Sequence, residues 1–265
     1  MKTRTTNLLK SGIVAVAVLV GIFLSFTAFS YISLEKGKGD IVRQTRDLKD
    51  FKGIKVSHGI EVVFKQSENE EVVVETYENL QSIIITKIEN GVLRIYADEN
   101  YKASITPKVY VSLKVLESLE GSSGSNLKGE NLIKSKKLYV ELSSASELEL
   151  SIETASFNSK QSSGSEMNIQ LESKEIYCDL SSGSSCELKG NSDVLLASAS
   201  SGSEINAYNL SAKKCTISTS SGADAEIYIS EEINAKASSG SEVTYKGNPQ
   251  SKNIEISSGA DVSKE

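Results

Sequence analysis

The chain has 265 residues, a formal net charge of −6 and three cysteines, and it contains no Trp and two Pro. An acidic chain repels phosphate groups, so nucleic acid and anionic membrane surfaces are not expected partners. Three cysteines are too few for a disulfide-stabilised scaffold.

An uncharged, mostly apolar segment spans residues 11–34, and it follows three basic residues, Lys2, Arg4 and Lys10. About 20 apolar residues suffice to cross a bilayer, with the basic flank in the cytoplasm. Residues 1–32 are therefore expected to be either an uncleaved membrane anchor, with residues 12–32 as the helix, or a signal peptide cleaved after Ser30. Both alternatives export the remainder of the chain to the periplasm or the outer cell surface.

Residues 33–46 are polar and are expected to form a linker. Residues 47–116 are predicted to be a β-rich part. In FKGIKVSHGIEVVFKQ, apolar residues alternate on both sides of Gly59, which predicts two strands joined by a bend. Further strand-like runs follow, separated by turn signals: EVVVETYENL, QSIIITKIENG, VLRIYADEN and KVYVSLKVLESL. This part is expected to begin and cap the region that follows.

Residues 117–265 contain eight repeats of a Ser-Ser-Gly sequence, with Ala145 in place of Gly in one of them. The marker positions are 124, 145, 164, 183, 202, 222, 240 and 259, so successive spacings are 21, 19, 19, 19, 20, 18 and 19 residues. A nearly fixed period of this length is typical of a solenoid, in which each repeat packs on its neighbours.

Within each repeat, apolar residues alternate with polar ones on both sides of the marker. Positions −7, −5 and −3 before Gly183 are Ile176, Cys178 and Leu180, and positions +3 and +5 after Ala145 are Leu148 and Leu150. A period of two indicates strands, and no repeat shows the 3.6-residue period of a helix. The sequence therefore predicts an all-β parallel β-helix, in which each repeat is one rung of about 19 residues, made of two strands and a bend.

The Gly of each bend is expected to adopt a positive φ or to allow close backbone packing. The serines are expected to bond to the bend backbone and to serines of adjacent rungs. Position +2 is predicted to point outward and carries an acid in six rungs, which stacking would align in a column: Glu147, Glu166, Glu204, Asp224, Glu242 and Asp261. This column is either a solvated edge that keeps the rod soluble, or a weak stripe for divalent cations or another ligand.

No catalytic or cofactor-binding set is found in the sequence. The only histidine, His58, lies beside Gly59 at a predicted bend, so no second His is present for a metal cluster or a catalytic triad. Cys178 and Cys186 occupy inward positions of one rung and are expected to be buried thiols, with a disulfide between them as the alternative. Cys215 is two rungs away, too far for a disulfide.

The opening FKGIKVSHGIEVVFKQ and the SSGSE-type repeats resemble the head GIN domain family of auto-transporter adhesins, over residues 47–262. Gly59-Ile60-Glu61 stands where that family has Gly-Ile-Asn, so the third residue departs from the pattern. The resemblance implies a right-handed parallel β-helix behind an export signal, as in envelope proteins of Bacteroidetes. It implies an adhesin role, and it brings no catalytic residue or cofactor.

Three functions follow as hypotheses. The first is a non-enzymatic exported protein of the cell envelope that binds a surface glycan or a protein along its extended face. The second is an assembly role, in which end rungs stack on other copies through an open strand edge. The third is a polysaccharide-degrading enzyme that uses a pair of stacked carboxylates, Glu204 and Asp224.

Overall fold

The computed structural model describes residues 34–265, and the predicted helix at residues 12–32 lies outside the described residues. Residues Glu35–Glu265 form one compact unit. This unit consists of strands β1–β20 and one short 3-10 helix, η1 (Glu78–Leu80). In the described part, helical structure is too short and too polar to span a membrane.

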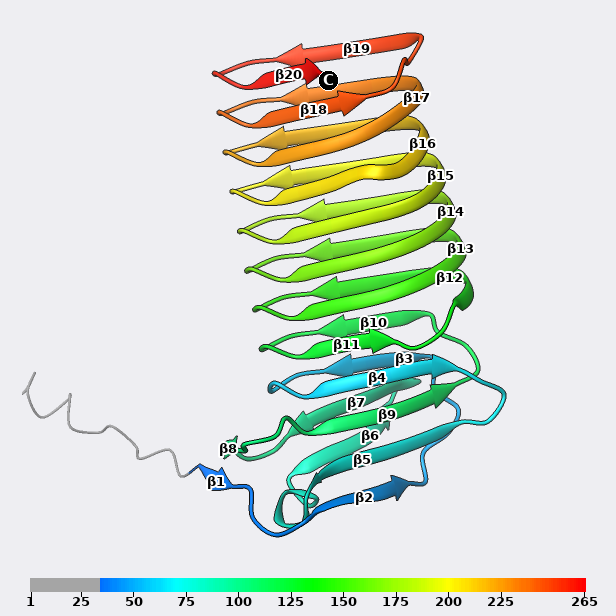
Figure 1. The fold of residues 1–265 in the computed structure, drawn as a ribbon, viewed down its shortest axis with the longest axis vertical. Helices are drawn as coiled ribbons and strands as arrows, with labels where there is room; N and C mark the ends of the chain where they lie inside the picture. The colour runs from blue at the N-terminus through cyan, green and yellow to red at the C-terminus, as the bar shows by residue number, and fades with distance from the viewer. Residues whose placement is uncertain (1–33) are drawn as a thin grey trace, which may run out of the picture. The chain divides into compact units, whose positions relative to one another are not determined.

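The Ser-Ser-Gly repeats form a β-solenoid whose rungs stack in register (Figure 1). All neighbouring strands of this region pair in parallel. The strands are β10 (Ser118–Gly121), β11 (Asn126–Gly129), β12 (Ile133–Leu142), β13 (Glu147–Gln161), β14 (Glu166–Leu180), β15 (Ser185–Ser200), β16 (Glu204–Ser220), β17 (Asp224–Ala237), β18 (Glu242–Lys246), β19 (Ser251–Ile256) and β20 (Asp261–Lys264). The predicted β-helix with one rung per repeat is confirmed.

Each Ser-Ser-Gly sequence forms a tight turn with two successive residues in the left-handed region. Ser182 has φ 55° and Gly183 has φ 68°, and the Ser184 N–H donates to the Ser181 carbonyl at 3.3 Å. Two successive positive φ values are the property of a type I′ turn, in which Gly is favoured. The Gly183 N–H donates to the carbonyl of Ser201 in the next rung at 3.1 Å, so the turns are also bonded along the solenoid.

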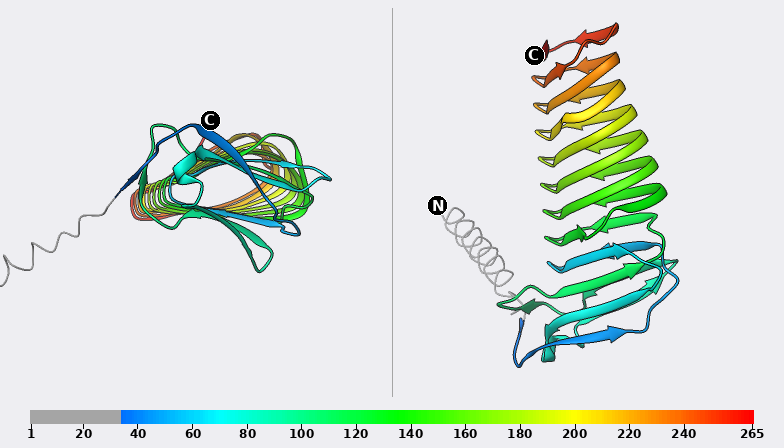
Figure 2. Two further views of the ribbon diagram at one scale, coloured as in Figure 1. Left: turned by 90° about the horizontal axis from the view of Figure 1, so that it is seen from below. Right: turned by 45° about the vertical axis from the view of Figure 1, so that its right-hand side comes forward.

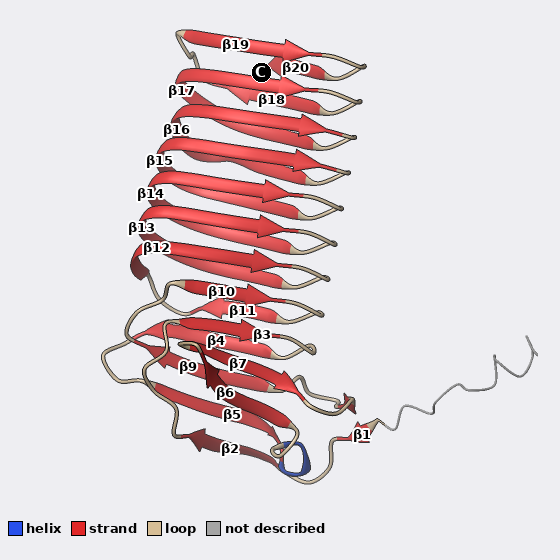
Figure 3. Cartoon of the chain, turned by 180° about the vertical axis from the view of Figure 1, so that it is seen from behind, coloured by secondary structure: helices blue, strands red, loops and turns tan. Residues whose placement is uncertain are grey.

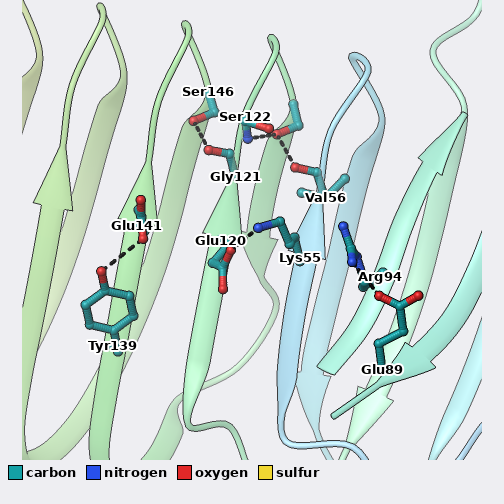
Figure 4. Close-up of polar contacts among 11 residues, drawn as sticks. Lys55, Val56, Glu89, Arg94, Glu120, Gly121, Ser122, Tyr139, Glu141 and Ser146 are labelled. Atoms are coloured by element: carbon teal, nitrogen blue, oxygen red, sulfur yellow. Dashed lines mark hydrogen bonds and ion pairs between the residues drawn. The ribbon is translucent and has the colours of Figure 1, made fainter. Parts of the chain in front are cut away.

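In most turns the residue after the Gly is a serine that points inward and is almost fully buried, and Ser146 holds the equivalent position after Ala145. Ser146 is 0% exposed. Its hydroxyl accepts from the Ser143 N–H at 3.1 Å. It also donates to the carbonyl of Gly121 in the preceding rung at 2.9 Å (Figure 4). One side chain therefore closes its own turn and joins two rungs, which confirms that the serines bond to the bend backbone.

The rungs are flattened, so that the solenoid has two walls with a narrow core between them (Figure 2). We name the strands that enter the Ser-Ser-Gly turns the leading wall, and the strands that leave them the following wall; Figures 1 and 3 show the molecule from opposite sides. Long strands such as β13 and β14 curve around the other edge and contribute to both walls. The predicted inward rows are buried, with Ile176, Cys178 and Leu180 at most 1% exposed.

The outer face of the leading wall is joined across strands by polar contacts. Lys55 pairs with Glu120 and Arg94 pairs with Glu89 (Figure 4). The Tyr139 hydroxyl donates to Glu141 at 3.0 Å. Partial burial and this bond raise the pKa of Tyr139 to about 12.

The N-terminal part continues both walls and then closes them with antiparallel strands. On the leading wall β3 (Gly53–Val56) pairs with β10 and with β7 (Val92–Ala97), and β7 pairs antiparallel with β6 (Ile84–Glu89). On the following wall β4 (Glu61–Gln66) pairs with β11 and β9 (Lys108–Leu113), and β5 (Glu71–Tyr77) lies antiparallel to β9. The turn between β3 and β4 repeats the Ser-Ser-Gly geometry, because His58 and Gly59 both have φ 66°.

The segment predicted as a linker, residues 33–46, contains two strands. These are β1 (Glu35–Lys36), which pairs with β8 (Tyr101–Lys102), and β2 (Ile41–Arg46), which lies antiparallel to β5 at the edge of the following wall. Most of β2 is exposed, so it lacks the alternation of apolar and polar residues that reveals a half-buried strand. Its place in the sheet depends on backbone pairing.

All three cysteines are free, buried thiols. Cys178 accepts a hydrogen bond from the Ser159 hydroxyl at 3.3 Å. Burial raises the pKa of the Cys215 thiol to about 12. The structure thus agrees with the expected buried thiols rather than with a Cys178–Cys186 disulfide.

Candidate binding site

The six acids of position +2 lie in one exposed column on the outer face of the following wall. Register pairs Glu147 with Glu166, and continues through Glu204, Asp224, Glu242 and Asp261 after an interruption at Ser185. Adjacent members are therefore one strand spacing apart, about 4.8 Å. All six side chains are exposed, as predicted from strand parity.

The carboxylates of the column bond to neighbouring side chains rather than converging on a point. The Asn126 amide donates to Glu147 at 2.8 Å, and the Thr244 hydroxyl donates to Glu242 at 3.3 Å. Among residues 34–265, the His, Cys, Asp and Glu side chains form no group of three or more that is placed to hold a metal ion. Cation binding by the column stays a prediction.

A groove of about 820 Å³ lies over the lower part of this face, on β4, β11, β13, β14 and β15. Two residues of the acidic column, Glu147 and Glu166, line it. The other four, Glu204, Asp224, Glu242 and Asp261, lie on later strands and are not among its lining residues. The structure therefore brings only part of the predicted stripe into a concave surface.

The groove is lined mainly by charged and amide side chains. Five of them are glutamates and two are lysines, and the amides are Asn126, Asn168 and Gln170. Lys128 bonds to Glu149 at 2.7 Å and Lys189 to Glu187 at 2.7 Å. The lining thus offers hydrogen-bond donors and acceptors side by side, with an excess of negative charge.

Most groove residues outside the +2 column were not singled out from the sequence. Seven of them occupy positions +4 and +6 after the turns: Lys128, Glu149, Ser151, Asn168, Gln170, Glu187 and Lys189. Their parity is the same as that of the acids, so their outward orientation was available from the sequence. What the sequence did not reveal is that the face is hollowed at these rungs.

A smaller cavity of about 390 Å³ adjoins the groove at its N-terminal end, and the two share Gly59 and Thr106. His58 lines this cavity, and its Nδ1 lies 2.8 Å from the Ser57 hydroxyl. The Tyr101 hydroxyl donates to the His58 carbonyl at 2.7 Å. The predicted position of His58 in a bend is confirmed.

Beyond the groove, the following wall carries two tyrosines. A bulge in β16 contains Tyr208, whose hydroxyl donates to Glu265 at 2.8 Å and whose ring has the Lys246 ammonium 4.0 Å from its centroid. Partial burial and the bond to Glu265 raise the pKa of Tyr208 to about 12. Tyr228, on β17, is 37% exposed.

A family model described as "Putative auto-transporter adhesin, head GIN domain" matches residues 50–249 of the chain. Among curated proteins, the comparison finds no match to this chain.

Three of the solved structures that share this fold come from Parabacteroides. A putative adhesin from Parabacteroides merdae is 19% identical with a TM-score of 0.82, covering 87% of this chain and 98% of its own. A putative adhesin from Parabacteroides distasonis is 20% identical with a TM-score of 0.82, covering 88% and 100%. A putative lipid binding protein from Parabacteroides distasonis is 19% identical with a TM-score of 0.81, covering 88% and 100%. At these identities the likeness shows the fold alone.

Proposed function

Because the chain belongs to the family described as "Putative auto-transporter adhesin, head GIN domain", we propose that it is an adhesin-like binding protein of the cell envelope. Its binding surface is the groove on the following wall. The family and the similar structures are described as adhesins or a lipid-binding protein, and none of these descriptions names an enzyme. The proposed role is therefore binding without catalysis.

The groove is the single observation that carries this proposal. A flat sheet face offers no enclosure, whereas this face is hollowed to about 820 Å³, within the range of small-molecule sites. Its side chains present amide, carboxylate and ammonium groups at positions fixed by the strands below. Such a surface suits a ligand that carries many hydroxyl groups, since each hydroxyl both donates and accepts.

The negative charge of the groove disfavours one class of ligand, the anions. Glutamates outnumber lysines among its lining residues, so an anionic ligand would be repelled. The lining is mostly polar, which disfavours a lipid chain as the occupant. A neutral glycan is both uncharged and polar, so it fits the groove on both counts. A protein partner is the other candidate, and the binding test must distinguish the two.

The proposed location is the cell envelope, since residues 12–32 match an export segment and the family is described as adhesins. The N-terminal segment either anchors the protein in a membrane or is removed. Protease treatment of intact cells, followed by immunodetection of residues 120–265, distinguishes the outer surface from the periplasm.

A bulky side chain in the groove should block binding. Asn168 is a half-buried, outward-facing groove residue, and Asn168→Trp fills the space without touching the core. We expect this change to lower the affinity for a neutral polysaccharide about tenfold or more. The measurement is binding of the full-length protein to a panel of immobilised neutral glucans, mannans and galactans, with uronate polymers as anionic comparators.

The matched control is Asn158→Trp, because Asn158 is also half-buried and outward-facing but lies on the leading wall. This variant should bind like the wild type. The proposal would be contradicted if both variants lost the same affinity for neutral polysaccharides, or if the wild type bound only uronate polymers. Release of reducing ends from any bound glycan would contradict the absence of catalysis, and binding to protein-coated but not to glycan-coated surfaces would identify a protein partner.

A further inference from the structure

The groove crosses the following wall obliquely, from the turn side at β4, where Gly59 and Glu61 line it, to positions +4 and +6 of β15, where Glu187 and Lys189 line it. Its lining residues come from successive strands of the following wall, β4, β11, β13, β14 and β15. Register aligns Asn126, Glu147, Glu166 and Ser185 in one column. Equivalent polar positions thus recur about every 4.8 Å along the axis.

A second column runs beside the first and has the same spacing. Register aligns Lys128, Glu149, Asn168 and Glu187 on the same strands. Two parallel columns of donors and acceptors match a linear polymer of sugar units, because such a polymer repeats its hydroxyl groups along its length. A compact ligand would use only one or two members of each column.

The same outer face continues past the groove toward the C-terminal rungs. Tyr228 on β17 lies two strands beyond β15, about 10 Å farther along the axis. Tyr208, between them, already has its hydroxyl bonded to Glu265 and its ring against Lys246. Tyr228 presents more of its surface, with 37% of it exposed.

The exposed ring of Tyr228 offers an aromatic surface on which a sugar ring can stack. No aromatic side chain is among the groove's lining residues in the described part of the chain. The C–H face of a sugar ring is weakly apolar and slightly positive, and it stacks on the negative face of an aromatic ring. Register connects Tyr228 through Ser211 to Asn191, which lies two residues beyond the groove residue Lys189. A chain that follows the oblique groove past β15 therefore approaches a stacking platform at Tyr228.

We propose that the ligand is a linear, uncharged polysaccharide that follows the groove obliquely across the following wall and extends from it to Tyr228. This inference rests on the proposed function of the groove. It adds the polymeric character of the ligand, its direction on the protein and a second contact. The excess of glutamates in the groove excludes uronates and sulfated chains by charge.

The test is a titration of the full-length protein with a series of neutral oligosaccharides, from disaccharide to decasaccharide, of the sugar that the panel identifies. For the wild type, affinity should rise with length until the chain reaches Tyr228. Tyr228→Ala should lose about tenfold in affinity for the longest oligosaccharides and nothing for the shortest. Tyr228→Phe retains the ring and should bind like the wild type.

The structure offers a matched control on the opposite wall. Tyr177 is 39% exposed, nearly the same as Tyr228, and lies on the leading wall, so Tyr177→Ala should leave all affinities unchanged. If Tyr228→Ala binds long chains like the wild type while Asn168→Trp still lowers the affinity about tenfold or more, the inference is wrong and the proposed function stands. If Asn168→Trp also binds normally, the proposed function itself fails.

Discussion

At the scale of single residues, the turn at Ser144 and Ala145 differs from its neighbours. Ala145 occupies the Gly position with φ 58°, and Ser144 before it has φ 53°. A side chain with a Cβ in this region raises the energy by about 1–2 kcal/mol. The equivalent glycines have no atom within 4 Å of an added Cβ, so the methyl group of Ala145 gains little packing in return.

Ala145→Gly should therefore stabilise the protein. The relief of the left-handed strain exceeds the added entropy of Gly in the unfolded chain, and the net gain in the free energy of unfolding should be about 0.5–1 kcal/mol. Denaturant unfolding of the full-length protein measures it. The reverse change at a neighbouring turn, Gly183→Ala, should destabilise by a similar amount; a loss of stability in Ala145→Gly would contradict this account.

Individual residue positions were predictable wherever strand parity decides orientation. The outward acids Glu147 and Glu166 and the inward Leu148 follow from counting residues from the turn. The buried role of Ser146 was less evident, because serine is ordinarily a surface residue. Burial becomes favourable there because its hydroxyl bonds to the backbone of two rungs.

At the scale of elements, the strands at the C-terminal edge have an unusual composition. In β19, Ile254 and Ile256 occupy inward positions but are 37% and 51% exposed, because no further rung covers them in the structure. Lys252 and Lys264 also occupy inward positions, where earlier rungs carry buried residues such as Ile233 and Tyr245. An inward-pointing charge on an edge strand opposes pairing with another edge.

Replacing these two lysines should turn the edge into an association site. We expect the double variant Lys252→Ile, Lys264→Val to form oligomers whose size grows with protein concentration, whereas the wild type stays monomeric. Size-exclusion chromatography with light scattering measures this. Lys236→Ile, which removes an outward lysine paired with Glu255, is the control and should behave like the wild type.

This expectation bears on the hypothesis of assembly through end rungs. A wild-type protein that associates through β19 and β20 would show that the two lysines do not protect the edge, and it would support the assembly role over the binding role. A double variant that stays monomeric would also contradict the protective role of the lysines, but it would give assembly through this edge no support.

Elements were predictable where they bury one face and not where they depend on backbone pairing alone. Along each wall, the strands β13–β17 alternate buried and outward-facing residues, and the alternation breaks near the corner between the walls and at the bulge in β16. The exposed edge strand β2 has no such pattern, so the sequence predicts a linker there. The bulge in β16 had a signal in the sequence, the 20-residue spacing between Gly202 and Gly222.

At the scale of the whole molecule, the regular spacing of the turns determines the solenoid. A rung cannot bury its inward row alone, so equal repeats stack and share one continuous core. The antiparallel closure by β5, β6 and β2 was expected only as a cap, without its topology, because these strands pair with partners outside the repeat.

The sequence predicts which residues of the candidate site face outward, but it does not predict the hollow, because the hollow depends on several rungs together. Parity identifies every outward residue, including Glu147, Glu166 and Asn168, but it treats all rungs alike. A hollow arises where side-chain sizes and the course of several rungs combine, and no single repeat contains that information. Glu204 and Asp224, the pair considered for catalysis, consequently lie outside the groove.

The central claim is that the groove on the following wall holds a neutral glycan, and side-chain amide resonances test it most directly. Asn126, Asn168 and Gln170 line the groove, whereas Asn158, Asn234 and Asn253 lie on the leading wall. In a titration of the ¹⁵N-labelled full-length protein with the neutral oligosaccharide selected by the panel, the three groove amides should shift and the three leading-wall amides should not. Shifts confined to the leading-wall amides, or unchanged groove amides in the presence of a bound oligosaccharide, would contradict the account.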